Sequence, residues 1–391
     1  MSGASGLERV SGEKREQSPI YTLLVIPSLD AIDWHIFLGR PRLPQPTSPM
    51  IEVLREARIL VTGAGGSIGS ALALRLAGIA PKRLVLLESS ERALFALQNS
   101  FAEVAPQELP QCILGSVLDS NLVEEVFEHH APSIVFHAAA FKHVPLLEEH
   151  PLAAIESNVF GAKTLVSAAV AHGARVILLS TDKAVEPASI MGATKRVAEC
   201  IVLGAGGMVL RLGNVLASSN SVAELFAQQI ASGGPLTITD PAARRYFLTI
   251  EEAVDLLIAA SAAADRPVLL APDLRSPQFI TDLAQFMARV LAPGRDVSIQ
   301  FTEPRPGDKE LEKLWSPDET AVPAMAQSLL SIHSNLMTGA AFDRELDALE
   351  NATLARDLPA AIGCLRSLVP DFTPSAALLS LAQRHIVRVA R

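Results

Sequence analysis

RILVTGAGGSIG, residues Arg58–Gly69, joins a short apolar strand to a glycine-rich turn and then to the start of a helical pattern. Glycine permits positive φ and close backbone approach, and the free N–H groups at a helix N-terminus attract phosphate. A strand, a glycine turn and a helix in this order predict a cradle for the pyrophosphate of a dinucleotide. Its candidate cofactor-binding residues are Thr62, Gly63, Gly65, Gly66, Ser67, Ile68 and Gly69.

The segments that follow alternate between strand and helix patterns. Strands are expected at Arg58–Val61, Arg83–Leu87, Gln111–Gly115, Ser133–His137, Arg175–Leu179 and Met208–Leu212, and helices from Ser67 and at Arg92–Val104, Asn121–His129, Leu152–His172 and Val222–Ser232. Such alternation predicts an α/β fold, a Rossmann-type doubly wound parallel sheet whose ligands lie beyond the carboxyl ends of its strands. The less regular later half predicts a smaller C-terminal substrate-binding lobe.

Three regions are expected along the chain. Residues 1–50 form an N-terminal tail and a proline-rich strap at Gly39–Met50, and residues 51–316 form the nucleotide-binding core with its substrate lobe. Residues 317–391 read as a helical C-terminal extension with one apolar face, which favours packing or dimerisation. We therefore expect a homo-oligomer.

Composition limits the classes of function. The 391 residues are 49% hydrophobic and carry a net charge of −9 without a basic block, which argues against nucleic-acid binding. Cys112, Cys200 and Cys364 lie far apart, so we expect neither disulfides nor a metal site, and a reducing cytoplasm fits. The polar N-terminus and the lack of an apolar run of about 20 residues predict a soluble cytoplasmic protein with no membrane span.

Five positions after the cradle bear on the cofactor. Glu88 ends the second strand, where a carboxylate accepts hydrogen bonds from a ribose diol and repels a 2′-phosphate, which favours NAD over NADP. The alternative is an ordinary carboxylate at a helix N-terminus, with Ser89 and Ser90 free to contact a phosphate. Asp119 either meets the adenine or caps a helix. The small residues Ala138, Ala139 and Ala140 let the backbone lie against the cofactor.

The spacing Gly63-x-x-Gly66-x-x-Gly69 is typical of short-chain dehydrogenases, which normally carry Tyr-x-x-x-Lys after the fifth strand. Here Lys195 is present, but Met191 occupies the tyrosine position. The only tyrosines, Tyr21 and Tyr246, are not followed by lysine four residues later. This pattern argues against a plain alcohol dehydrogenase.

Six motifs follow one another along the chain: VTGAGGSIGS, FHAAAFKHVPLLEEHP, LSTDKAVEPASIMGATKRVAE, RLGNVLAS, GGPLTITDPAARRYFLTIEEAV and RPGDK. A weaker match, VPDFTPS, lies near Val369. With these motifs the chain resembles the polysaccharide-biosynthesis family of nucleotide-sugar 4,6-dehydratases, extended short-chain dehydrogenases that act on UDP-N-acetylglucosamine. Members of its membrane-attached branch similarly carry methionine for tyrosine.

The resemblance implies NAD, a UDP-sugar and a set of site residues. Catalysis would involve Thr181, Asp182, Lys183, Met191 and Lys195; the sugar nucleotide would contact Lys142, His143, Asn214, Ser221, Arg245 and Arg305. Lys183 would be the C5 base, with its pKa lowered by burial beside Lys195 or by the cofactor's charge, and Asp182 would be an acid with a raised pKa. Without the cradle and Lys195, Thr181-Asp182-Lys183 would read as a capping turn, and Lys142 as a solvated lysine.

Ser219 and Asn220 depart from the family pattern, which tends to have arginine and glycine there, so a phosphate-binding cation is missing. Two alternatives stay open. One is a UDP-sugar epimerase, which would return the hydride to C4. The other is a dinucleotide-binding regulator without turnover, which Met191, Ser219 and Asn220 would favour.

Overall fold

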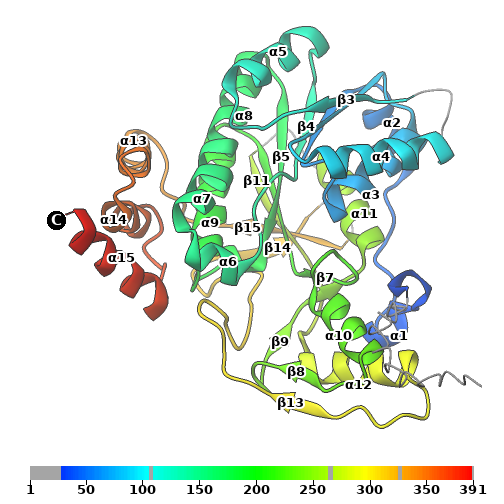
Figure 1. Ribbon diagram of the computed structural model, residues 1–391. Coiled ribbons are helices and arrows are strands. Elements are labelled where there is room, and N and C mark those ends of the chain that lie inside the picture. Colours follow the sequence, from blue (N-terminus) through cyan, green and yellow to red (C-terminus); the bar gives the residue numbers. More distant parts are fainter. Residues whose placement is uncertain (1–27, 105–108, 263–266, 325–327, 390–391) are drawn as a thin grey trace, which may run out of the picture.

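The centre of the molecule is a nine-stranded sheet, seen in a computed structural model that describes residues 28–104, 109–262, 267–324 and 328–389 (Figure 1). Among these residues its parallel part has the order β3-β2-β1-β4-β5-β6-β11. These strands are β1 (Arg58–Thr62), β2 (Arg83–Glu88), β3 (Gln111–Leu114), β4 (Ile134–His137), β5 (Arg175–Thr181), β6 (Met208–Leu212) and β11 (Val268–Pro272). The predicted Rossmann-type sheet is therefore confirmed.

Helices cover both faces of this sheet, which explains why its central strands are almost continuously apolar. On one face α3 (Ser67–Ile79) packs against α11 (Ile250–Ala262), and α11 also contacts α2 (Ser48–Arg55). On the other face lie α5 (Ser120–His130), α8 (Gly161–Ala171) and α9 (Ile190–Gly204) (Figure 1). Helix α4 (Glu91–Val104) packs on β2 and β3.

The single helix expected at Leu152–His172 is divided in the structure. It consists of α7 (Pro151–Ile155), a π-helical turn η2 (Glu156–Phe160) and α8. Helix α6 (Val144–Glu149) precedes it directly. Such π turns often accompany functional sites, and this one carries a buried asparagine described below.

A smaller lobe with its own apolar core lies beyond the carboxyl ends of the strands (Figure 1). Its elements are α1 (Trp34–Leu38), α10 (Val222–Ala231), α12 (Ile280–Leu291), the pair β8 (Leu236–Ile238) and β13 (Ile299–Phe301), and the pair β9 (Arg244–Arg245) and β12 (Gln278–Phe279). Trp34 packs near Phe286, so the lobe also uses a residue from the expected N-terminal tail, next to the short 3₁₀ turn η1 (Leu29–Ala31).

The prediction that residues from 317 onward are helical is wrong for two segments. β14 (Thr320–Pro323) and β15 (Leu329–His333) are strands, and β15 pairs antiparallel with β11. Leu329 and Ile332 are buried there. A free edge of β11 would leave backbone groups unpaired, and this pairing satisfies them.

The predicted helical C-terminal region begins later. It consists of α13 (Ala340–Leu354), α14 (Leu358–Leu368) and α15 (Ala376–Val389), which lie against the side of the molecule formed by α6, α7 and α9 (Figure 1). One contact ties it to the segment before α9, and a second ties it to α6. Thr373 N–H donates to the Pro187 carbonyl at 3.0 Å, and the Ser375 hydroxyl donates to the buried carboxylate of Glu148.

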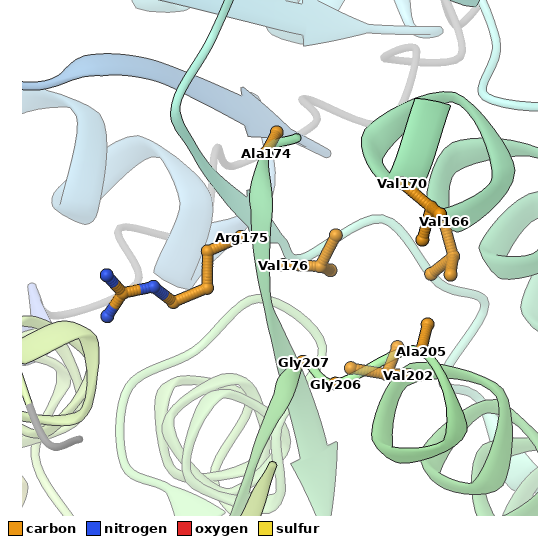
Figure 2. Close-up of a pocket in the computed structure, with 9 residues that line it drawn as sticks. All are labelled: Val166, Val170, Ala174, Arg175, Val176, Val202, Ala205, Gly206 and Gly207. Atoms are coloured by element: carbon orange, nitrogen blue, oxygen red, sulfur yellow. The ribbon is translucent and has the colours of Figure 1, made fainter. Parts of the chain in front are cut away.

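A small pocket at the amino ends of β5 and β6 is distant along those strands from the expected site (Figure 2). It has a volume of about 30 Å³, and its lining residues are Val166, Val170, Ala174, Arg175, Val176, Val202, Ala205, Gly206 and Gly207. The Arg175 guanidinium points away from the valines and donates to the Ser261 carbonyl (Figure 2). This pocket therefore offers no group for acid–base chemistry.

Candidate active site

The glycine turn after β1 is shaped by contacts that exclude any side chain. Gly63 has φ +66°, and a Cβ there would lie 2.5 Å from the Ala139 nitrogen. A Cβ on Gly69 would lie 2.1 Å from the Gly63 carbonyl oxygen. At Gly66, the N-cap of α3, the nearest atom would be 3.3 Å away, and no side chain caps the helix. The backbone is thus closely packed at Gly63 and Gly69, and no side chain occupies the capping position at the N-terminus of α3, where free N–H groups can bind an anion.

Glu88 lies beside this turn at the end of β2. Its carboxylate accepts hydrogen bonds from Gly65 N–H at 2.9 Å and Ser90 N–H at 2.8 Å, and the residue is buried. The carboxylate is therefore held next to the cradle, where the predicted ribose contact would occur. Asp119 instead caps α5 by accepting from Leu122 N–H at 3.1 Å, which is the alternative that the sequence left open.

The strand ends of β1 and β4 meet below the cradle. Thr62 Oγ1 lies 2.7 Å from His137 Nδ1, and Ala138 N–H donates to the Thr62 carbonyl. Burial, with help from the charge of Lys195, lowers the pKa of His137 to about 3. This histidine is thus neutral. The sequence reasoning had not singled it out, although its place at a strand end was visible.

A second missed residue, Asn158, organises the segment that follows β4. From the π turn, its side chain accepts from Phe141 N–H at 2.8 Å and donates to the Phe141 carbonyl at 3.1 Å and to Thr194 Oγ1 at 3.1 Å. Asn158 thereby ties the Ala138–Ala140 segment to α9. In the sequence Asn158 follows the polar residues Glu156 and Ser157, so nothing in the local pattern distinguished it.

The turn after β5 holds the predicted catalytic residues within hydrogen-bond distance of one another. Thr181 Oγ1 donates to Asp182 Oδ1 at 2.9 Å. Lys183 Nζ, in the 3₁₀ turn η3 (Asp182–Ala184), donates to the same Oδ1 and to Asn214 Oδ1, both at 3.0 Å. Asn214 comes from β7 (Asn214–Val215), which pairs with β10 (Phe247–Leu248). The structure thus brings these four residues together.

Glu312 also reaches this cluster, and the sequence did not predict it. Its Oε1 lies 3.8 Å from Lys183 Nζ, and its Oε2 lies 2.7 Å from Lys309 Nζ. Residue Glu312 is 2% exposed. In the sequence, DKELEK reads as a solvated run of charges, and only the tertiary fold shows that one of these carboxylates is buried.

Burial and the charges in this cluster shift the pKa values of Asp182 and Lys183. Burial raises the pKa of Asp182, and Glu312 adds to this effect although Lys183 opposes it. Burial disfavours the Lys183 ammonium, but the charges of Asp182 and Glu312 outweigh burial and raise its pKa. The predicted direction is thus correct for Asp182. It is wrong for Lys183, because the prediction took no account of the charges of Asp182 and Glu312.

Helix α9, which carries the predicted residues Met191 and Lys195, packs closely against this turn. A Cβ on Gly192 would lie 2.2 Å from the Lys183 carbonyl oxygen, so α9 contacts η3 closely. Met191 is buried in the first turn of α9, and one turn later Lys195 Nζ donates to the Leu179 carbonyl at 2.7 Å. Burial lowers the pKa of Lys195 to about 8, although Glu199 opposes the shift.

The N-terminus of α9 is held by groups from distant segments. Ser189 caps it by accepting from Gly192 N–H, and Glu148 of α6 accepts from Ile190 N–H at 2.7 Å. Glu148 is the same carboxylate that receives the Ser375 hydroxyl. Gly307 packs here as well, since a Cβ on it would lie 2.8 Å from Ser189 Cβ.

Lys142 contacts the loop that carries Ser219 and Asn220, the two positions that depart from the family pattern. Its Nζ donates to the Ser219 carbonyl at 2.8 Å, and Ser219 N–H donates to Ser67 Oγ in the cradle at 2.9 Å. The loop after β7 therefore bridges to the glycine turn. His143 stands at the N-cap of α6 without a side-chain capping bond, and burial and Lys142 lower its pKa.

The remaining predicted substrate residues differ in their surroundings. Arg245 is buried and donates to the Glu310 carbonyl at 3.0 Å, and its charge acts on Lys183. Ser221 caps α10 by accepting from Glu224 N–H. Arg305 is exposed and pairs with Asp308 at 2.9 Å. Arg245 thus belongs to the central cluster, whereas no contact in the described residues joins Ser221 or Arg305 to it.

The described residues contain neither a membrane-spanning helix nor a cluster of metal ligands. Within the ranges that the structure describes, no helix combines the length and apolar character needed to cross a bilayer. Nor do these ranges bring together three or more His, Cys, Asp or Glu side chains in an arrangement that could hold a metal ion.

Three curated relatives match most of this chain. EpsC of Bacillus subtilis, a probable polysaccharide biosynthesis protein, is 37% identical over 291 residues, which are 72% of this chain and 49% of EpsC. The capsular polysaccharide biosynthesis protein CapD of Staphylococcus aureus is 35% identical, over 76% of this chain and 51% of CapD. The chain thus spans about half the length of both. A UDP-glucose 4-epimerase of Rickettsia massiliae is 32% identical over 68% of this chain and 80% of its own.

Solved structures agree with the fold. Pen from Bacillus thuringiensis superposes with a TM-score of 0.66 at 27% identity, over 73% of this chain and 89% of Pen. DesIV of Streptomyces venezuelae, a dTDP-glucose 4,6-dehydratase, superposes with a TM-score of 0.56 at 23% identity, over 64% of this chain and 86% of DesIV. The family model described as polysaccharide biosynthesis protein matches residues 59–334. The chain therefore belongs to the polysaccharide biosynthesis protein family.

Proposed function

We propose that the chain is an NAD-dependent nucleotide-sugar 4,6-dehydratase acting on UDP-N-acetylglucosamine or a close UDP-sugar. The observation that carries the proposal is the Asp182–Lys183 pair at the end of β5. A carboxyl group with a raised pKa lies 3.0 Å from an amine, and both lie on the edge of the sheet where the dinucleotide cradle opens. Elimination of water needs an acid and a base in one site, and this pair supplies both.

The cradle supports a nicotinamide dinucleotide. The close packing of Gly63 and Gly69 and the uncapped N-terminus of α3 suit a pyrophosphate, and Glu88 suits an unphosphorylated ribose. DesIV was solved with NAD bound, which is consistent with this reading. Bound NAD would supply a hydride acceptor at sugar C4 and a hydride donor at C6.

The protein's own groups would act on protons. Oxidation at C4 acidifies the neighbouring C5–H, so an amine as weak as Lys183 can remove that proton when it is neutral. Asp182 would protonate the departing C6 hydroxyl, and Thr181 would hydrogen-bond the C4 oxygen. Lys195 would hold the nicotinamide ribose, since its position one turn after Met191 matches the lysine of short-chain dehydrogenases.

Met191 cannot take the C4 hydroxyl proton, because a thioether is not a base. Water or Asp182 would accept this proton instead. The sugar nucleotide's phosphates would lie near Arg245 and Lys142, and the exposed Arg305 would turn from Asp308 toward them. His143, Asn214 and Ser221 would contact the rest of the ligand, and Asp119 would stay a helix cap or contact adenine.

Incubation with NAD and UDP-N-acetylglucosamine tests the proposal. A dehydratase yields a product lighter by one water, and its 4-keto sugar shows a characteristic absorbance in alkali. An unchanged mass with altered C4 stereochemistry would instead identify an epimerase. No product at all would identify a binding protein.

The epimerase is the second candidate, and one observation favours it. The Rickettsia relatives named UDP-glucose 4-epimerase are 32% identical to this chain over 281 residues. An epimerase does not need an acid for a C6 hydroxyl. The buried Asp182 with a raised pKa therefore favours the dehydratase.

A further inference from the structure

Glu312 is a buried carboxylate that lies near the same lysine, Lys183, as Asp182 does. Its side chain is 2% exposed, and Oε1 lies 3.8 Å from Lys183 Nζ while Asp182 Oδ1 lies 3.0 Å from the same nitrogen. A buried carboxylate is costly unless it is paired. Lys309, 2.7 Å from Oε2, already pairs with Glu312, so the contact with Lys183 is additional to what burial requires.

The charged and titratable groups around Glu312 come from three segments. Asp182 and Lys183 lie on η3, Arg245 on β9 and Lys309 on the same segment as Glu312. Lys309 also donates to the Val185 carbonyl at 2.8 Å, which fixes its segment against the turn. Burial, and then the charge of Asp182, raise the pKa of Tyr246, the residue before β10. The charges of Asp182, Glu312 and Arg245 act on the Lys183 ammonium.

The proposed elimination changes the charge of Lys183. The C5–H bond breaks and its proton forms an N–H bond on Lys183, while the electron pair forms a C5–C6 double bond. The C6–O bond breaks, and the departing hydroxyl takes the Asp182 proton and leaves as water. Until that proton is transferred, Asp182 is neutral and cannot neutralise the new ammonium. At that moment the other carboxylate within 4 Å of Lys183, among the residues that the structure describes, is Glu312.

We propose that Glu312 is a positioning residue for the dehydratase reaction: it holds and stabilises the ammonium that Lys183 becomes on taking the C5 proton. This inference rests on the proposed function. It adds a residue that acts through Lys183 rather than on the substrate. Removing the charge of Glu312 should make Lys183 a weaker base without disturbing the cradle.

Glu312→Gln tests the proposal because glutamine keeps the shape and removes the charge. Glu310→Gln, an exposed position two residues earlier, is the matched control. In protein labelled with ¹⁵Nζ-lysine, NMR would follow the titration of Lys183, whose signal is the one absent from Lys183→Met. The Lys183 midpoint should fall by about one pH unit in Glu312→Gln. It should not move in Glu310→Gln, and an unchanged midpoint in Glu312→Gln would overturn the proposal.

The second readout is deuterium incorporation at C5 from solvent as a function of pH. Incorporation rises as Lys183 loses its proton, so in Glu312→Gln this rise should shift to lower pH and reach a plateau about tenfold lower, with NAD affinity unchanged. A shifted midpoint with an unchanged plateau would overturn the proposed positioning role of Glu312. If Glu312→Gln does not fold, Glu312→Asp keeps the charge on a shorter arm; a wild-type midpoint and plateau would support the proposal, whereas a lowered midpoint with a wild-type plateau would overturn it.

The Lys183 titration requires no turnover, so the two proposals fail separately. Wild-type protein without product would remove the dehydratase function. A Lys183 midpoint independent of Glu312 would remove only the present inference.

Discussion

The cradle and the Asp182–Lys183 cluster lie on the same edge of the sheet but are built in opposite ways. The cradle uses twelve consecutive residues, Arg58–Gly69, and its shape depends on the absence of side chains. The cluster joins the adjacent Asp182 and Lys183 to Asn214 and Glu312, which come from two other parts of the chain, and it acts through side-chain charge and hydrogen bonds. Cofactor binding at the cradle should therefore weaken when a methyl group is added to one of its glycines. The cluster should fail when a charge is removed.

The largest effect is expected for Lys183→Met. Methionine fills much of the same space but cannot accept a proton, so C5 deuterium incorporation should fall by about 10³-fold or more while NAD still binds. Mass spectrometry of product formed in deuterated water measures this. Lys82→Met, at an exposed lysine, is the control. Retained exchange in Lys183→Met would remove Lys183 from the role of base.

Asp182→Asn should cost about 10²-fold or more in turnover, because asparagine cannot protonate the C6 hydroxyl. Stopped-flow absorbance should still show reduction of the cofactor if water takes the C4 proton, which separates the two possible acceptors. Asp296→Asn, at an exposed aspartate, should behave as the wild type. Near-normal turnover of Asp182→Asn would exclude Asp182 as the acid.

On the cradle side, Gly69→Ala adds one methyl group that would lie 2.1 Å from the Gly63 carbonyl oxygen. NAD affinity should weaken by about tenfold or more, which titration calorimetry can measure. Gly78→Ala is a matched control on the same helix, because no atom lies within 4 Å of a Cβ there. Equal NAD affinities of the two variants would contradict the packing argument.

Glu88→Ser should change cofactor preference rather than catalysis. Serine removes the charge that would repel a 2′-phosphate, so the ratio of NAD to NADP affinity should fall by about tenfold. Competition titration gives this ratio for the variant, the wild type and Glu91→Ser, a nearby exposed control. If wild-type protein already binds NADP more tightly, this assignment of Glu88 is wrong.

The smallest effect is expected at Met191. If water or Asp182 accepts the C4 hydroxyl proton, Met191→Tyr should leave the rate of C4 oxidation within about tenfold, a change under about 1.4 kcal/mol. Single-turnover measurement of cofactor reduction gives that rate. An inactive wild type combined with an active Met191→Tyr variant would show that the chain is a binding protein.

The difference between the two regions also explains what could be predicted. The parallel sheet and the cradle follow from local patterns, since periodicity and glycine spacing are visible within about 30 residues. β14 and β15 were not predicted, because their short apolar segments become strands only by pairing with β11. Tertiary pairing outweighs local propensity there.

In the site, Thr181, Asp182, Lys183 and Lys195 could be located because motif spacing places them after β5 and on α9. Glu312 could not, since its burial depends on how the segment after residue 304 returns to the turn. The direction of the Lys183 pKa was missed because the prediction considered burial and left out the charges of the adjacent Asp182 and of the distant Glu312. Charge interactions depend on distances in space, and sequence spacing does not determine them.

Glu148 joins two parts of the chain in one buried carboxylate, which accepts from Ile190 at the start of α9 and from Ser375 before α15. If the C-terminal helices opened locally, this carboxylate would lose a donor while it stayed buried, at a cost of about 1–3 kcal/mol. Hydrogen exchange would therefore report the C-terminal segment and the first turn of α9 as one cooperative unit. The last helices of the chain thus share the local stability of the helix that carries Met191 and Lys195.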